Sequence, residues 1–331
     1  MIAVLSINGA LVGAEVVHRD GDVVAVIAGA KISRAEVSQK ESAKLLQARN
    51  QYYLAERDAL EQFIDDYLLE QKASREHLTV DALVKRDIES KVQDPTDDQL
   101  QVYYEGVGTE EPYPAVRDKI LGYIRQHRIK RARAEYLKVL REDAGVSVFL
   151  APPTADVNVA GAFLRGAQGA PVQLVEFADY ECPYCQQVDP LVRKLEHEFD
   201  GKVTVAFKDF PLPMHHQAEK AAEASRCAGA QGHYWEFHDL LFEKPGQLDI
   251  AQLKEDARTL RLDTGKFDKC LDDGEQAATV KKDVDEAHRL GLTGTPSFFV
   301  NGHFASGSVK YEMLHDLVEQ GLTETTASAA K

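Results

Sequence analysis

The chain has 331 residues, with 44% hydrophobic residues, 28% charged residues and a formal net charge of −15. The composition is typical of a folded globular protein and excludes wholesale disorder, and the length favours two domains. The acidic balance argues against nucleic-acid binding, and no stretch approaches the roughly 18 uninterrupted apolar residues of a membrane span, so any membrane contact is expected to be peripheral.

The N-terminal segment, residues 1–18, is apolar but lacks the basic start of a secretory signal. Its first basic side chain is Arg19, and Asn8 and Gly9 interrupt the apolar run. A signal peptide begins with basic residues and continues into an unbroken apolar stretch. We interpret residues 1–18 as either a tail or the remnant of a signal.

The following region, residues 19–150, is predicted to be mainly helical. The β-branched run Asp22–Ala28 indicates a strand. Ser33-Arg34-Ala35-Glu36 has the form of a capping box, in which Ser33 and Glu36 satisfy each other's backbone donors. Apolar spacing indicates helices beyond this point, namely from the capping box to about Gln71, over Asp81–Val92, and from about Ala115 to Asp143.

A second short strand is predicted at Val146–Leu150, near the end of this region. Because short strands are unstable alone, we expect Val23–Ile27 to pair with it and so close the domain. The sequence Ala151-Pro152-Pro153 would then begin a linker over residues 151–157.

A resemblance supports a separate N-terminal domain. The stretch VIAGAKISRAE at residues 26–36 resembles the opening of the N-terminal region of SurA/PrsA-type chaperone-isomerases. The resemblance implies a client-binding or oligomerisation unit, but no isomerase domain follows it. The basic run between Arg125 and Lys138 is either a patch for an acidic partner or, as we favour, the solvated side of a helix.

The motif that indicates chemistry is Cys182-Pro183-Tyr184-Cys185. A buried strand, Val172–Phe177, precedes it and an amphipathic stretch, Gln186–Phe199, follows it. This order places Cys182 at a helix N-terminus, which favours a thiolate, and Pro183 suits the first turn. We predict Cys182 as an exposed nucleophile and Cys185 as the sheltered resolving thiol.

A zinc site is the alternative use of such a motif. A four-thiolate site needs a second close cysteine pair, and the remaining cysteines, Cys227 and Cys270, lie far apart. We therefore predict no metal and no cofactor.

Four motifs in chain order resemble DsbA-type thiol-disulfide oxidoreductases: PVQLVEFADYECPYC (171–185), VTVAFKDFPLPMH (203–215), CAGAQGHYWEFHDLLF (227–242) and GTPSFFVNG (294–302). The resemblance implies an α/β thioredoxin-like fold over residues 158–323, with a helical insertion at about 216–290, and residues 324–331 as a disordered tail. Tyr184 departs from the common Cys-Pro-His-Cys of that family, which puts the redox poise in doubt.

The same resemblance implies roles for individual residues. Pro296 is expected to be cis, with Thr295 facing the sulfurs. Glu176 corresponds to the buried acid beneath the active site, although an edge-strand Glu pointing to water remains an alternative. Cys227 and Cys270 are expected to form a structural disulfide, the alternative being two buried free thiols.

The function implied is an enzyme that exchanges disulfides with unfolded or misoxidised exported proteins through Cys182 and Cys185, as an oxidase or an isomerase. It would work with a redox partner, either a membrane oxidase or a reductase. Cysteine usage favours a bacterial periplasmic or other extracytoplasmic location. The alternative is a chaperone-like client-binding or oligomerisation protein in which the dithiol is secondary.

Overall fold

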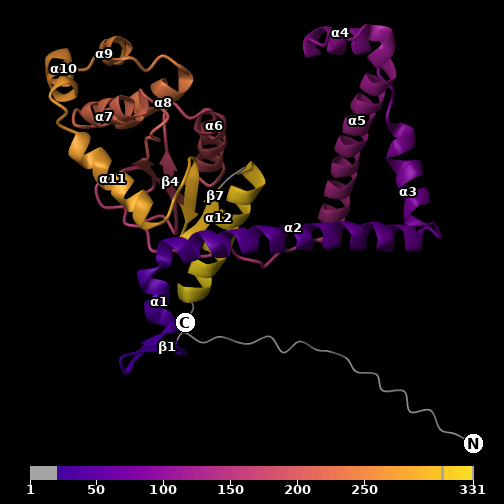
Figure 1. Cartoon of the computed structure of the whole chain (residues 1–331), viewed down its shortest axis with the longest axis horizontal. Coiled ribbons are helices and arrows are strands. Elements are labelled where there is room, and N and C mark those ends of the chain that lie inside the picture. Colours follow the sequence, from indigo (N-terminus) through magenta and orange to yellow (C-terminus); the bar gives the residue numbers. More distant parts are fainter. Residues whose placement is uncertain (1–20, 307–308, 330–331) are drawn as a thin grey trace, which may run out of the picture. The chain divides into compact units, whose positions relative to one another are not determined.

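The structure is a computed structural model that describes residues 21–306 and 309–329 (Figure 1). The predicted tail or signal remnant at residues 1–18 lies outside the described residues. Contacts divide the chain into two compact units, one formed by residues up to Gln51 together with those from Pro152 onward, the other by Tyr52–Ala151. Residues 21–51 therefore group with the C-terminal half instead of with the rest of the expected 19–150 domain.

The first elements form a local hairpin. Strand β1 (Val23–Ile27) pairs antiparallel with β2 (Ala30–Ser33) across the turn Ala28-Gly29. Both turn residues have positive φ, of 47° and 85°, and two such residues match the twist of paired strands. The predicted pairing of β1 with Val146–Leu150 is wrong, because the adjacent strand takes its place and 146–150 forms no strand.

The predicted capping box is present. The Ser33 hydroxyl accepts from the Glu36 backbone N–H, and the Glu36 carboxylate accepts from the Ser33 N–H, at 2.7 Å. Helix α1 (Arg34–Lys40) begins there, and α2 (Ser42–Arg75) follows it.

The unit Tyr52–Ala151 is helical, as expected for this region. It contains the remainder of α2 and then α3 (Val80–Asp87), the 3₁₀ turn η1 (Glu89–Lys91), α4 (Asp97–Val107) and α5 (Tyr113–Ala144). Two small apolar clusters hold it together, consisting of Leu69, Ala73, Leu83 and Leu137, and of Leu100, Val116 and Ile120.

Several members of the basic run on α5 pair with residues of the same unit. Arg125 pairs with Asp94, and Arg131 pairs with Glu135 one turn along the helix. These exposed contacts agree with our preference for a solvated helix side over a patch for an acidic partner.

The C-terminal half is built on a mixed five-stranded sheet in the order β3-β5-β4-β6-β7. Its strands are β3 (Phe163–Gly166), β4 (Val172–Ala178), β5 (Val203–Asp209), β6 (Ser297–Val300) and β7 (His303–Ser306). Strands β4 and β5 are parallel and the other neighbours are antiparallel. The predicted strand at Val172–Phe177 is confirmed, whereas β3 and β7 were not expected.

Helices cover both faces of the sheet. Because side chains alternate along β4, Val172 and Leu174 face α6 (Pro183–Glu198) and α12 (Tyr311–Ala329). Val175 and Phe177 face the opposite side, where α11 (Ala277–Arg289) packs. Helix α12 continues through Ala329, so the prediction of a disordered tail from residue 324 is wrong up to that residue. Within this stretch, the Thr325 hydroxyl donates to the Pro171 carbonyl oxygen at 3.2 Å.

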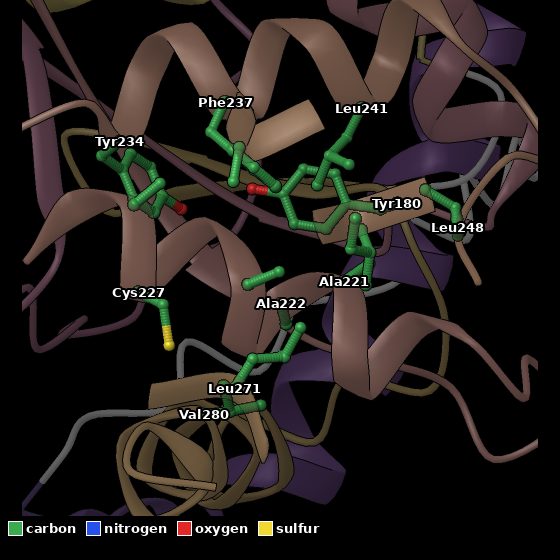
Figure 2. Packing of buried hydrophobic residues seen from close by; sticks show 14 of the residues in the cluster. Tyr180, Ala221, Ala222, Cys227, Tyr234, Phe237, Leu241, Leu248, Leu271 and Val280 are labelled. Carbon is green, nitrogen blue, oxygen red and sulfur yellow. The ribbon is translucent and has the colours of Figure 1, made fainter. Parts of the chain in front are cut away.

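Five helices lie between β5 and β6, as the expected insertion at about 216–290 requires: α7 (Ala218–Gly229), α8 (Tyr234–Glu243), α9 (Ile250–Thr259), α10 (Thr264–Asp272) and α11 (Ala277–Arg289). Figure 2 shows their core, in which Tyr180 lies near Phe237 and Leu241 of α8. A disulfide joins Cys227 of α7 to Cys270 of α10, with Cα atoms 5.9 Å apart.

A buried ionic cluster ties the sheet to this insertion. The Arg226 guanidinium on α7 binds the carboxylates of Asp209 on β5 and Asp283 on α11. Lys208 binds the same Asp283 at 2.8 Å and also donates to the Asn158 carbonyl oxygen at 2.9 Å. All four charged side chains are buried.

Within the described residues, no helix combines the length and the apolar character needed to cross a membrane.

Candidate active site

The turn between β4 and α6 positions the Cys-Pro-Tyr-Cys motif. Asp179 organises this turn, because its carboxylate accepts from the Glu181 backbone N–H at 2.7 Å, and its carbonyl oxygen accepts from the Cys182 N–H at 3.1 Å. Cys182 is the N-cap residue of α6 and Pro183 the first helical residue. The first-turn N–H groups of α6 therefore lie beside the Cys182 sulfur.

Both thiols of the motif are buried and free. Cys182 is 3% exposed and Cys185 is fully buried. The expectation of an exposed Cys182 is therefore corrected. The reason is a loop from far along the chain, since the Cys182 Sγ lies 3.5 Å from the Thr295 carbonyl oxygen.

The pKa values of the two thiols are shifted in opposite directions. The hydrogen bond from the Cys185 thiol lowers the pKa of Cys182 to about 5; the Thr295 side chain and the backbone N–H groups of Cys185 and Tyr184 add to this effect and outweigh the opposing effect of burial. Burial raises the pKa of Cys185 well above its ordinary value. At neutral pH the reduced site therefore holds a Cys182 thiolate beside a protonated Cys185.

This difference can be measured directly. We expect the alkylation rate of Cys182 in the reduced protein to rise with pH through a midpoint near 5, because only the thiolate reacts. Cys185 should remain unmodified across this range. A midpoint near the ordinary thiol pKa, or preferential labelling of Cys185, would contradict the assignment of the nucleophile.

The loop that covers the sulfur enters β6 through Thr295 and Pro296. The Thr295–Pro296 peptide bond is cis. Strand β6 lies antiparallel to β4, with Ser297 opposite Phe177, and this register brings the loop alongside the turn that carries Cys182. The main-chain carbonyl oxygen of Thr295 lies beside the Cys182 sulfur. The Thr295 hydroxyl is also buried there, and its hydrogen bond to the sulfur contributes to the lowered pKa of Cys182.

Glu176 lies beneath the motif on the face of β4 that α6 covers. The Glu176 side chain is buried, so the alternative of an edge-strand Glu pointing to water is wrong. Burial, together with the nearby charge of Asp189, raises its pKa to about 8, and above that pH the ionised carboxylate raises the pKa of Cys185 further. Glu176 is therefore protonated at neutral pH and is suited to exchange a proton with the resolving thiol.

The raised pKa of Glu176 has a consequence for stability. The folded protein holds a proton on Glu176 that the unfolded chain releases above its ordinary pKa of about 4.3, so this group makes stability fall as pH rises from about 5 to 8. We expect Glu176→Gln to remove this slope. In urea unfolding at about pH 5 and pH 8, the free energy of unfolding of the variant relative to the parent should be higher at pH 8 than at pH 5. An equal difference between variant and parent at the two pH values would contradict a protonated Glu176.

His215 also reaches the site, from the loop after β5. Its Nδ1 lies 2.7 Å from the Asp179 carboxylate, which also accepts from the Leu212 backbone N–H at 2.8 Å. Partial burial lowers the pKa of His215, but the Asp179 hydrogen bond and the charges of Asp179 and Cys182 outweigh this and raise it. His215 and His216 line a cavity of about 640 Å³ beside α11.

Asp179 was not singled out in the sequence. The available signal was an acidic residue directly after a buried strand and three residues before the first cysteine. At such a place the backbone N–H groups of a turn need a side-chain acceptor.

One group among the described residues has the composition of a metal site. The ligand atoms of Asp189, His238 and Asp239 lie within 4.8 Å of one another. Arg193 binds the Asp189 carboxylate at 2.5 Å, and Arg165 binds Asp239 at 2.9 Å. These arginines already balance the two carboxylates, so we assign the group as a partly buried ion-pair network.

Comparison with known proteins identifies the domain that carries this site. Residues 159–320 match the model of a protein family described as Thioredoxin. This region forms a thioredoxin-like domain. The expected fold class, a thioredoxin-like α/β domain with a helical insertion and a helical region before it, is confirmed. The resemblance of the N-terminal region to SurA/PrsA-type chaperones stays a prediction.

Individual relatives cover this chain only in part. It is 38% identical over 197 residues to the Na(+)/H(+) antiporter NhaA 1 of Salinispora arenicola, a match that spans 59% of this chain and 29% of the antiporter. The chain thus spans less than a third of that relative, and antiporter activity is stated only of that relative, by its name.

Two solved structures resemble the chain over about half its length. A thioredoxin-like oxidoreductase from Silicibacter pomeroyi DSS-3 is 30% identical with a TM-score of 0.46, covering 49% of this chain and 92% of that one. Oxidised BdbD from Bacillus subtilis is 25% identical with a TM-score of 0.49, covering 52% and 98%.

Proposed function

We propose that the thioredoxin-like domain is a protein thiol-disulfide oxidoreductase that oxidises substrate thiols through Cys182 and Cys185. The observation that supports this best is the opposite shift of the two thiol pKa values within one Cys-x-x-C motif. A low pKa stabilises the Cys182 thiolate, and therefore favours the reduced enzyme and makes its disulfide an oxidant.

The proposed reaction begins with the Cys182–Cys185 disulfide. A substrate thiolate attacks the Cys182 sulfur, a mixed disulfide forms, and Cys185 leaves and takes up a proton, for which protonated Glu176 is the donor. The second substrate thiolate then attacks the substrate sulfur of the mixed disulfide, and Cys182 leaves as a thiolate. The substrate loses two electrons and gains a disulfide, while the enzyme dithiol gains the two electrons.

We infer that the substrates are unfolded or misoxidised exported proteins and that the site works outside the cytoplasm. The disulfide between Cys227 and Cys270 is of the structural kind that persists in oxidising compartments. Within the motif, Tyr184 is 66% exposed, and Met214 in the His215 loop is 69% exposed. Such apolar side chains suit contact with unfolded polypeptide. In the oxidase reaction, a membrane oxidase would reoxidise the dithiol. The alternative is the isomerase reaction, in which a reductase partner would keep the dithiol reduced.

The experiment is to measure both directions of exchange. The oxidised protein should oxidise a reduced two-cysteine peptide in stoichiometric amount, and its equilibrium with glutathione should give a reduction potential in the oxidant range. Rapid insulin reduction together with failure to oxidise the peptide would contradict the oxidase and favour a reductase. Disulfide reshuffling of a scrambled protein by the reduced form would favour the isomerase.

A second candidate function concerns the helical unit Tyr52–Ala151. On α2, the aromatic side chains of Tyr52, Phe63 and Tyr67 recur at intervals that place them on one helix face, and Tyr52 and Phe63 are 68% and 67% exposed. Such an aromatic stripe favours self-association of the chain through this helix. The double variant Tyr52→Ser/Phe63→Ser should then lower the mass in solution. An unchanged oligomer with weaker suppression of client aggregation would instead support the chaperone alternative.

A further inference from the structure

The N-terminal part of α2 packs against the segment that leads to Thr295 and Pro296. The Gln47 amide nitrogen donates to the Gly291 carbonyl oxygen at 2.8 Å. Asn50, one turn further on, donates to the Ser306 hydroxyl at 3.4 Å. Leu46, directly before Gln47, is buried in the cluster that contains Leu290 and Phe304. This stretch of α2 is therefore part of the thioredoxin-like unit.

The approach of the two backbones at this contact is close. Gly291 has a φ of +72°, and a Cβ at this position would lie 2.7 Å from the Ala43 carbonyl oxygen. Only glycine satisfies both conditions without a shift of the helix. The glycine after α11 therefore allows α2 to pack directly beside the loop 291–296.

A small polar cavity of about 240 Å³ lies at this contact. Its walls are Gln47 from α2, the loop residues 293–297, and Phe304 and Ser306 of β7. It adjoins the reactive sulfur through Thr295, which lines the cavity while its carbonyl oxygen contacts the Cys182 Sγ. Every lining side chain is uncharged, and most are polar.

One polar group that lines this cavity has hydrogen-bonding capacity left for a ligand. Gln47 uses one N–H on Gly291, and no further hydrogen bond from its amide is found among the described residues. An incoming group with donor and acceptor atoms would satisfy the Gln47 amide, whereas a charged group would be desolvated with no opposite charge to offset the cost.

We propose that Gln47 is a specificity-determining residue of the oxidoreductase: it contacts the substrate residue next to the reacting cysteine and selects an uncharged polar side chain there. The inference rests on the proposed function, since it assigns the substrate preference of that same site. Gln47 lies outside the matched residues 159–320, so this preference is supplied by the chain's N-terminal segment.

The test uses the full chain and four two-cysteine peptides that differ only next to the reacting cysteine, where they carry Ser, Asn, Asp or Lys. We expect the parent protein to oxidise the Ser and Asn peptides with a kcat/KM about tenfold above that of the charged ones, the scale of one lost hydrogen bond. Gln47→Ala should raise KM for the Asn peptide and flatten the order. Gln47→Glu, nearly isosteric, should raise kcat/KM for the Lys peptide and lower it for the Asp peptide.

Arg49→Ala is the matched control, because Arg49 lies on the same helix segment, is exposed, and contacts Ser38 rather than the cavity. This variant should keep the parent's order of peptides. If Gln47→Ala fails to fold, the opposite changes in kcat/KM for the Lys and Asp peptides in Gln47→Glu carry the test alone, and a purely structural role would not produce them. An unchanged order in the Gln47 variants, or a parent protein that oxidises all four peptides equally, overturns the inference. A parent protein that oxidises none of the peptides overturns the proposed function instead.

Discussion

Replacing Cys182 by Ser is expected to lower the rate of peptide oxidation by at least about a thousandfold, the scale on which loss of a catalytic nucleophile acts. The substrate bond is formed to this sulfur, and its hydroxyl substitute forms no disulfide. Stopped-flow oxidation of a two-cysteine peptide measures the effect. A variant that retained activity would show that the exchange does not pass through Cys182.

Cys185→Ser tests the other half of the assignment. This variant retains the nucleophile and lacks the resolving thiol, so it should accumulate a mixed disulfide with a peptide supplied as its disulfide. Mass spectrometry of the intact adduct should locate the bond at Cys182. A bond at any other cysteine would contradict the division of roles that the two pKa shifts indicate.

Breaking the buried ionic cluster is expected to have the largest effect on stability. Arg226→Leu leaves the carboxylates of Asp209 and Asp283 buried without the guanidinium that both of them bind. Removal of one partner from such a cluster costs about 3–5 kcal/mol. Denaturant unfolding should show a loss of this size, and a change of less than about 1 kcal/mol would mean that water reaches the carboxylates.

An exposed ion pair on the same helix as Asp283 supplies the control. Lys281 binds Asp285 at 2.6 Å, and both side chains are exposed. Because an exposed pair of this kind contributes roughly 0–1 kcal/mol, Lys281→Ala should leave the unfolding curve almost unchanged. The contrast separates the effect of burial from that of charge alone.

Local patterns in the sequence predicted the elements of the site well. The apolar run at Val172–Phe177 and the proline after Cys182 define a strand followed by a helix start, and both signals lie within a few residues of the atoms that they position. The capping box at Ser33 is a local signal of the same kind. Features that depend on neighbours in the chain were therefore accessible without a structure.

Features that depend on distant segments were not. The burial of Cys182 results from Thr295, which lies more than a hundred residues away. The pairing of β1 with β2 depends on Ala28 adopting a positive φ, which alanine rarely does. Gln47 looks like any polar residue of an amphipathic helix, and only the packing of α2 against Gly291 gives it a neighbour in the active-site loop.

The bond between Cys227 and Cys270 affects how redox measurements on this protein must be read. It closes a loop of 43 residues, and in the chain-entropy account its reduction would remove about 4 kcal/mol of stability. A strong reductant thus reduces both the Cys182–Cys185 and the Cys227–Cys270 disulfides. A total thiol count or a melting curve would therefore report the reduction of the catalytic and the structural disulfide together. Protein produced in a reducing cytoplasm would start without either bond. A potential for the active site should therefore be taken from a signal specific to Cys182, such as its alkylation.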